Sequence, residues 1–431
     1  MTHDLLAVYP RDSALDERGR LLLGGCDARE LAAEHGTPAY VVAERDLRDQ
    51  ARAYRDEFER QAPGAHVSFA SKAFPCTAVL RVFEQEGLGC DVASGGEMAL
   101  ALHAGFAPER LHLHGNARSE EELAAAVEHG VRQVVIDNFD DVDRLGRIAA
   151  ERGAVQAVGI RVTPDVRGDT HDGISTGQAD SKFGLGVADA REAIARIAAA
   201  PALRLDALHF HIGSQLLELD VFRRAVAAIA PLADAVEEIN LGGGLGVAYV
   251  ADQARRLPPV ADYVAEKVRA VRDLIGDRVR IADEPGRSLV GRAGVTLYEV
   301  QTVKRNVSTW VGVDGGMADN LRPMLYGARY EVQVVDRFVD PEDPDQVAAA
   351  THCRVVGKHC ESSDVLVAAA LLDAPRAGDV LVTPVTGAYG YAMANTYNGV
   401  PRPPVVFVGG GRSRVVVRRE RIDELWARDV E

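Results

Sequence analysis

The sequence predicts an α/β protein in which a (β/α)8 TIM-like barrel is joined to a second, mainly β domain. Between about residue 64 and 284, short apolar runs alternate with longer Ala- and Glu-rich amphipathic stretches, and this alternation fits eight strand–helix units. After about residue 288, the alternation becomes that of strands separated by turns. A doubly wound open sheet is the alternative arrangement for the first pattern.

Each expected barrel strand is a short apolar run, and the eight runs are 66–71, 88–91, 111–114, 133–136, 157–162, 206–211, 238–241 and 279–283. A helical stretch at 44–61 precedes the first strand. Ser119 is a suitable N-cap for the Glu- and Ala-rich helix that follows it. A further helix is expected from Val187 to Ala199, because Pro201 would end it.

The expected strands of the β-rich domain are 295–303, 310–313, 354–356, 380–384, 405–408 and 414–419. Arg20–Leu23 is a further short strand, expected to join the same sheet, and Pro341–Asp345 is expected to be an exposed loop. We therefore expect a barrel domain at 41–286 and a β-rich domain made of 1–40 and 287–431.

Composition narrows the class of protein. A chain of 431 residues with a net charge of −15 is long enough for two cores, and its acidity argues against nucleic acid and anionic membranes as partners. The five cysteines show neither zinc spacing nor a disulfide pattern, so no metal site is expected. The N-terminus has no basic segment followed by an apolar core, and no apolar run approaches the roughly 20 residues of a membrane span. We expect a cytoplasmic enzyme.

Lys72 stands at the end of the first expected strand, shortly before Pro75, where a solvated lysine is unusual. Partial desolvation there would lower the pKa of its amine and favour Schiff-base chemistry. Taken alone, a lysine that extends its amine from the strand end into water is the more common explanation.

Other polar or glycine-rich segments end five more strands: Asp91 and Ser94–Glu97, His114–Asn116, His209–Gln215, Gly242–Gly246, and Glu284–Arg287. The carboxyl ends of barrel strands converge on one face, where active sites form. The segments therefore predict an active site on that face.

These residue types match the needs of one cofactor. A lysine can form a Schiff base, a glycine run late in a barrel can approach a phosphate, and a buried carboxylate can face a protonated ring nitrogen. Glu284 could instead pair with Arg287, and His211 could stack on a ring or be an ordinary buried histidine. As a set, the residues favour pyridoxal 5′-phosphate, which serves as an electron sink for a carbanion.

The chain resembles the diaminopimelate decarboxylases, within the fold-type III pyridoxal-phosphate enzymes of alanine-racemase/ornithine-decarboxylase-like fold. The resemblance covers nearly the whole chain and rests on these motifs: Ala70–Ala73, Asp91–Glu97, His211–Gln215, Gly242–Gly246, Glu284–Arg287, Arg322–Gly327, Cys360–Asp364, Gly387–Tyr389 and Tyr397–Asn398. It implies decarboxylation of meso-2,6-diaminopimelate to L-lysine, the last step of lysine biosynthesis.

The resemblance also implies roles for single residues. Lys72 carries the cofactor, Glu284 faces the pyridine nitrogen and His211 stacks on the ring. The other implied cofactor residues are Asp91, Ser214, Gly243, Gly244, Gly286, Arg287 and Tyr389. The implied substrate residues are Arg287, Arg322, Tyr326, Glu361 and Tyr389. The implied assembly is a homodimer with shared sites, in which the partner subunit supplies Glu361 and the proton donor Cys360.

Three positions depart from the family pattern. Ser363 replaces a common glycine, Ala117-Arg118 replaces an Asn-Lys pair, and Ser71 replaces a small apolar residue. They leave open a decarboxylase for a related diamino acid in specialised metabolism. The barrel and its cofactor class are also compatible with an amino acid racemase or a non-catalytic cofactor-binding protein. A racemase needs a second base opposite Lys72, and a non-catalytic relative is expected to lack Lys72 or the cysteine loop.

Overall fold

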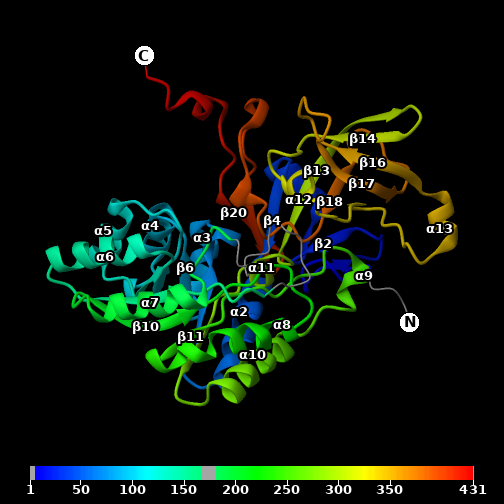
Figure 1. Ribbon diagram of the computed structural model, residues 1–431. Coiled ribbons are helices and arrows are strands. Elements are labelled where there is room, and N and C mark those ends of the chain that lie inside the picture. Colours follow the sequence, from blue (N-terminus) through cyan, green and yellow to red (C-terminus); the bar gives the residue numbers. More distant parts are fainter. Residues whose placement is uncertain (1–4, 167–180, 431) are drawn as a thin grey trace. The chain divides into compact units, whose positions relative to one another are not determined.

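The computed structural model describes residues 5–166 and 181–430 (Figure 1). The chain forms two compact units. The first contains residues 1–47, 247–257 and 290–431, and the second contains residues 48–246 and 258–289. The domain limits expected from the sequence remain a prediction; the compact units assign residues 41–47 and 247–257 to the first unit.

The second unit is a closed barrel of eight parallel strands, in the order β10-β11-β12-β5-β6-β7-β8-β9. The strands are β5 (His66–Ala70), β6 (Gly89–Val92), β7 (Leu111–Leu113), β8 (Gln133–Ile136), β9 (Gln156–Arg161), β10 (Leu203–His209), β11 (Glu238–Asn240) and β12 (Arg280–Asp283). All eight expected strands are confirmed, and closure of the barrel excludes the open sheet. The runs are short and apolar because both faces of each strand are covered.

Helices alternate with these strands, as the amphipathic pattern predicts. They are α2 (Glu44–Gln61), α3 (Thr77–Gln85), α4 (Gly95–Ala104), α5 (Glu120–His129), α6 (Phe139–Glu151), α7 (Val187–Ala198), α8 (Asp220–Ile229) and α10 (Val260–Leu274). Ser119 caps α5 through a capping box with Glu122, as its position predicts. In α6, Val142, Leu145 and Ile148 are buried on one face.

The first unit is built on a nine-stranded sheet, whose main path is β17-β16-β14-β13-β4-β19-β20 and to which β15 and β18 also pair. Its strands are β4 (Ala39–Ala43), β13 (Gly294–Arg305), β14 (Thr309–Val313), β15 (Gln333–Val334), β16 (Thr351–Val356), β17 (Val365–Leu372), β18 (Val380–Thr383), β19 (Val405–Gly409) and β20 (Arg412–Val417). The short helices are α1 (Ala28–His35), α9 (Ala251–Ala254), α12 (Arg322–Tyr326) and α13 (Pro344–Ala349), and α11 (Arg287–Val290) leads out of the barrel segment.

The structure corrects two expectations for the first unit. The segment at 20–23 forms β2 (Leu21–Leu23), which pairs with β1 (Ala14–Leu15) and β3 (Cys26–Asp27) in a separate small sheet rather than in the large one. The loop at 341–345 is largely exposed as expected, but it also begins α13, since Asp343 accepts hydrogen bonds from the first backbone N–H groups of that helix.

Candidate active site

Segments at the carboxyl ends of the barrel strands are hydrogen-bonded to one another. Ala70 N–H donates to Pro285 O at 3.1 Å, and Glu284 N–H donates to Gly242 O at 3.2 Å. These bonds join the ends of β5, β11 and β12, which are neighbours in the barrel. The predicted residues on these strands therefore stand on one rigid rim.

Lys72 lies in a single 3-10 turn, Ser71–Ala73, directly after β5. Its Nζ is 3.4 Å from Oδ2 of Asp91, a buried residue near the end of the adjacent strand β6. The Lys72 side chain is 45% exposed, so the desolvation expected from its position is not observed in this chain. Asp91 instead provides an opposite charge beside the amine.

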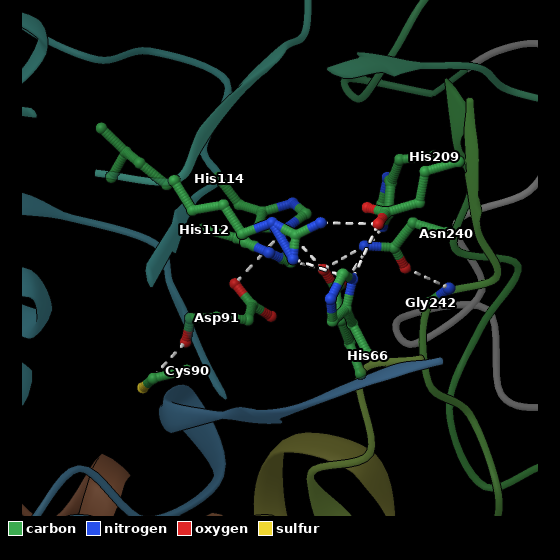
Figure 2. Close-up of polar contacts among 12 residues, drawn as sticks. His66, Cys90, Asp91, His112, His114, His209, Asn240 and Gly242 are labelled. Atoms are coloured by element: carbon green, nitrogen blue, oxygen red, sulfur yellow. Dashed lines mark hydrogen bonds and ion pairs between the residues drawn. The ribbon is translucent and has the colours of Figure 1, made fainter. Parts of the chain in front are cut away.

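Glu284 follows β12 and, among the described residues, accepts hydrogen bonds from three buried side chains: His209 on β10, Asn240 on β11 and His114 directly after β7. Figure 2 shows His114, His209 and Asn240 converging on one place. Its Oε1 accepts hydrogen bonds from His114 Nε2 at 2.8 Å and from Asn240 Nδ2 at 2.7 Å, and its Oε2 accepts one from His209 Nε2 at 3.1 Å. A carboxylate has about four acceptor positions. Among the described residues only His209 donates to Oε2, which leaves that oxygen a position for one more donor.

The pKa values of this group follow from burial and from the histidines. Burial by itself raises the pKa of Glu284, but the neighbouring histidines, above all His114, outweigh burial and bring that pKa well below its usual range. Burial lowers the pKa of His209 to about 4, so that His209 donates as a neutral imidazole at pH 7. Glu284 is therefore an anion at neutral pH and can face a cationic ring nitrogen.

The glycine run after β11 forms a close backbone cradle. A Cβ on Gly243 would lie 2.2 Å from Glu284 O, and Gly244, at φ +126°, would place one 2.9 Å from Gly213 O. Leu216 N–H donates to Gly244 O at 2.9 Å, so this loop also pairs with the loop after β10. Backbone packed this closely, with side chains absent, suits a phosphate group.

His211 and Ser214 come from the loop after β10. Burial, with the nearby charge of Lys72, lowers the pKa of His211 well below its usual range, so its ring is neutral. Ser214 Oγ accepts hydrogen bonds from Arg287 Nε and NH2, both at 3.1 Å. Arg287 was the alternative partner for Glu284; the structure gives that place to His114, His209 and Asn240.

The sequence missed the contribution of residues at other strand ends. Asn240 ends β11 and Arg161 ends β9, and the charges of Asp91 and Glu284 both act on Arg161. Their position in the sequence could have identified them. Like Lys72 and Asp91, each is a polar residue at the end of an apolar run.

Ligand atoms of His112, His114 and Glu284 lie within 4.8 Å of one another, which is close enough for a metal ion. Glu284 Oε1 already accepts two hydrogen bonds there, and His112 Nδ1 is 3.6 Å away from it. We therefore interpret the group as a hydrogen-bonded carboxylate.

The other predicted residues belong to the first unit. Arg322 begins α12 and is buried; its NH1 donates to Tyr330 Oη, and its guanidinium carbon lies 4.5 Å from the centre of the Tyr249 ring. Arg322 is therefore not part of a surface salt bridge. The sequence missed Tyr249 and Tyr330, because neither is close to Arg322 in a motif. Tyr326, at the end of the same helix, is half-buried.

Cys360 and Glu361 are exposed on a loop that is anchored at several points. Cys360 N–H donates to Asn398 Oδ1 at 2.9 Å, and the His359 ring stacks on Tyr397 with 5.8 Å between ring centres. Asp364 Oδ2 accepts hydrogen bonds from His359 N at 3.0 Å and Nδ1 at 2.8 Å. Cys360 is therefore not a small apolar residue of the core. Tyr389 lies on another loop and has φ +61°.

The departures from the family pattern have local partners. Ser71 is buried and donates to Glu97 Oε2 at 2.9 Å, and Arg118 is buried in an ion pair with Asp141. Ser363 is exposed on the cysteine loop. None of these contacts displaces a predicted site residue.

Over the described ranges, no helix is both long and apolar enough to cross a membrane.

Comparison with known proteins gives a consistent result. Residues 44–291 match the family described as pyridoxal-dependent decarboxylase, pyridoxal binding domain. The chain is 46% identical to the diaminopimelate decarboxylase of Actinosynnema pretiosum subsp. auranticum, over 96% of this chain and 93% of that one. It is 42% identical to the diaminopimelate decarboxylase of Mycobacterium bovis, over 98% of each chain.

The fold is similar to solved structures of the same enzyme. The diaminopimelate decarboxylase of M. jannaschii in co-complex with L-lysine superposes with a TM-score of 0.89, at 31% identity and over 98% of each chain. The match includes both the barrel and the β-rich unit.

Proposed function

Because this chain belongs to the pyridoxal-dependent decarboxylases and, among them, to the diaminopimelate decarboxylases, we propose how its residues divide the work of that reaction. The reaction is the pyridoxal 5′-phosphate-dependent decarboxylation of meso-2,6-diaminopimelate to L-lysine and carbon dioxide, the last step of lysine biosynthesis. The observation that best supports the assignment is the anionic Glu284, held by His114, His209 and Asn240 on the same barrel rim as Lys72.

The residues of the barrel rim fit the cofactor. When bound, pyridoxal 5′-phosphate supplies the electron sink for the bond that breaks. Lys72 holds it covalently through Nζ, and Asp91 lies beside that amine. Glu284 would keep the ring nitrogen protonated, with the open position on Oε2 available to accept its N–H, and His211 would stack on the ring. Gly243 and Gly244 bring backbone close to the phosphate, with Ser214, Gly286, Arg287 and Tyr389 as its further proposed contacts.

Residues of the first unit are proposed to bind the substrate. Arg322 and Tyr326, with Arg287, receive the distal carboxylate, because a guanidinium can bind both oxygens of a carboxylate. Glu361 binds the distal ammonium, and Cys360 delivers a proton to the carbon that has lost its carboxylate. We further propose a cytoplasmic homodimer in which the cysteine loop serves the site of the partner subunit.

The substrate assignment is tested by measuring carbon dioxide release from a panel of diamino acids that includes every diaminopimelate stereoisomer. We expect meso-diaminopimelate to be used best; a higher kcat/KM for ornithine or lysine would contradict the substrate assignment. The purified protein should be yellow, with a visible absorbance band from lysine-bound cofactor. Lys72→Ala should lose both this absorbance and turnover, and the exposed Lys304→Ala is the matched control.

The role of Arg322 is tested with two substrates. Arg322→Ala should reduce kcat/KM for diaminopimelate far more than for a diamino acid without the distal carboxylate. Tyr330→Phe removes one hydrogen bond to Arg322 while keeping the ring and serves as the control. Equal losses on both substrates would contradict the distal role of Arg322.

Shared sites are tested by mixing two inactive proteins, Lys72→Ala and Cys360→Ala, under conditions in which subunits exchange. If each site uses one residue from each subunit, random exchange should restore about a quarter of the wild-type activity. Proteins that exchange subunits and yet stay inactive would disprove shared sites.

A further inference from the structure

A fully buried lysine lies behind the barrel rim. Lys267, from α10, has 0% exposure of its side chain, and lysine is rarely buried unless it is paired. Its Nζ donates to Gly242 O at 2.8 Å, to Leu241 O at 3.2 Å, to Tyr263 Oη and to Asp283 Oδ1. The rings of Phe222 and Tyr263 each lie 4.3 Å from Nζ and exclude water. None of the site roles above involves this ammonium group.

Three of the partners of Lys267, namely Leu241, Gly242 and Asp283, come directly before residues of the candidate site. Leu241 and Gly242 lead from β11 into the cradle, whose next residue is Gly243. Asp283 is the last residue of β12 and immediately precedes Glu284. The Lys267 ammonium, on α10, is therefore bonded to the segments that directly follow β11 and to the last residue of the adjacent strand β12.

The Gly242 carbonyl connects the segment after β11 to the segment after β12. It accepts the bond from Lys267 and also one from Glu284 N–H at 3.2 Å. Gly242 N–H in turn donates to Asn240 Oδ1 at 3.0 Å, and Asn240 donates to Glu284 Oε1. A shift of this carbonyl would therefore change the separation between the glycine cradle and the Glu284 carboxylate.

We propose that Lys267, paired with Asp283, is a positioning residue for the cofactor, because it sets the separation between the phosphate cradle at 243–246 and Glu284. The role rests on the cofactor geometry proposed above. Lys267 lies behind the backbone of the site and acts on it through the Leu241 and Gly242 carbonyls, the second of which also accepts the Glu284 N–H. Asp283 neutralises the buried charge of the Lys267 ammonium, which makes these two hydrogen bonds.

The test compares two double variants of the full-length protein that both lack the buried charges. Lys267→Met/Asp283→Asn keeps the volume but has no donor at position 267, whereas Lys267→Gln/Asp283→Asn retains an amide donor. Each protein is equilibrated with graded pyridoxal 5′-phosphate, and the bound fraction is followed by absorbance. We expect the Met variant to bind the cofactor at least tenfold more weakly than wild type and the Gln variant to recover part of that loss.

A purely structural role makes a different prediction. In that case the Met variant would lower the melting temperature, but its folded fraction would bind the cofactor within twofold of wild type, and this result would overturn the proposal. The control is Glu238→Gln, which breaks an ion pair at the opposite end of the same strand β11 and should lower the melting temperature without weakening cofactor binding. At saturating cofactor, KM for the substrate should be unchanged in the Met variant.

Asp283→Asn alone covers the case in which the Met variant does not fold. It retains both bonds from Lys267 to the carbonyls, so cofactor affinity should remain within threefold of wild type. A tenfold loss of cofactor affinity in this variant would contradict the proposal. It would mean that the Asp283 carboxylate, rather than the hydrogen bonds from Lys267 to the two carbonyls, controls that affinity. If the wild-type protein itself binds no cofactor, the proposed function fails instead.

Discussion

A buried glutamate lies at each end of the barrel, Glu238 at one and Glu284 at the other, and the two have different surroundings. Glu238 begins β11 at the amino end, where Arg132 NH2 lies 2.6 Å and His66 Nδ1 2.8 Å from its Oε2. Glu284 follows β12 at the carboxyl end, where its donors among the described residues are His114, His209 and Asn240.

The partners differ in charge and in exposure. The side chain of His66 is 40% exposed and that of Arg132 21% exposed, so the amino-end group is an ion pair that reaches solvent. The donors to Glu284 are all buried, and none is an arginine or a lysine. We conclude that pairing with an arginine serves the amino end of the barrel, whereas hydrogen bonds from histidine and asparagine side chains serve the carboxyl end.

The largest effect expected from this difference is on turnover. Glu284→Gln removes the anion proposed to face the ring nitrogen, and by analogy with the loss of other electrostatic stabilisers kcat should fall on the order of 10²–10³-fold. Steady-state kinetics at saturating cofactor measure this loss. Glu238→Gln is the matched control and should leave kcat within twofold of wild type. A similar fall in kcat in Glu238→Gln would show that the two glutamates do not differ in their effect on turnover.

The second effect is a pH dependence of stability. Burial alone would raise the pKa of Glu238, but its hydrogen bond to His66 and the charge of Arg132 outweigh burial and lower it from 4.5 to about 2. Between these two values the unfolded chain takes up a proton that the folded protein does not, so stability falls as the pH decreases through this window. The contribution of Glu238 should be about 3 kcal/mol in total.

Chemical denaturation at a series of pH values measures this slope. Glu238→Gln should show a shallower dependence between pH 4.5 and 2 than the wild-type protein. Identical slopes would show that Glu238 has the same affinity for protons in the folded and unfolded chains.

A smaller effect is expected on stability at neutral pH. Glu238→Gln leaves Arg132 without its partner, but because Arg132 and His66 are partly exposed, the loss should be about 2 kcal/mol rather than the 3–5 kcal/mol of a fully buried pair. Urea denaturation at pH 7 measures it. No measurable loss would mean that water replaces the carboxylate at this end.

The smallest effect concerns a single donor to Glu284. Asn240→Ala removes one of two bonds to Oε1 and also the acceptor for Gly242 N–H, and kcat should fall about tenfold, since one hydrogen bond to a charged group contributes about 1.5 kcal/mol. The pH–rate profile provides the second readout, because loss of a donor raises the pKa of Glu284 and moves the acid limb to higher pH. A tenfold loss without that shift would indicate a change in packing only.

The sequence predicted the barrel well because its strands are short apolar runs whose ends carry conspicuous polar residues. It missed β4 (Ala39–Ala43), whose place between β13 and β19 depends on partners hundreds of residues away. It also missed β17, which lies beside the cysteine loop.

In the candidate site, too, residues marked by a local pattern were predicted and contacts between distant segments were not. Lys72, Asp91 and Glu284 were predicted because each interrupts an apolar pattern at a strand end. The support around them was not predictable, since the bonds of Asn240 and His209 to Glu284 and of Tyr330 to Arg322 depend on which strands and loops become neighbours. Periodicity within one segment carries no information about such contacts.

The backbone around Gly243 also limits how a mutational scan of this protein can be interpreted. An alanine at this position would place its methyl group against the Glu284 carbonyl, 2.2 Å away, so the backbone on both sides would have to move. A loss of cofactor in such a variant would report a collision between two loops rather than the strength of a phosphate contact. Phosphate recognition is better mapped with analogues of the cofactor, which change the ligand and leave the chain intact.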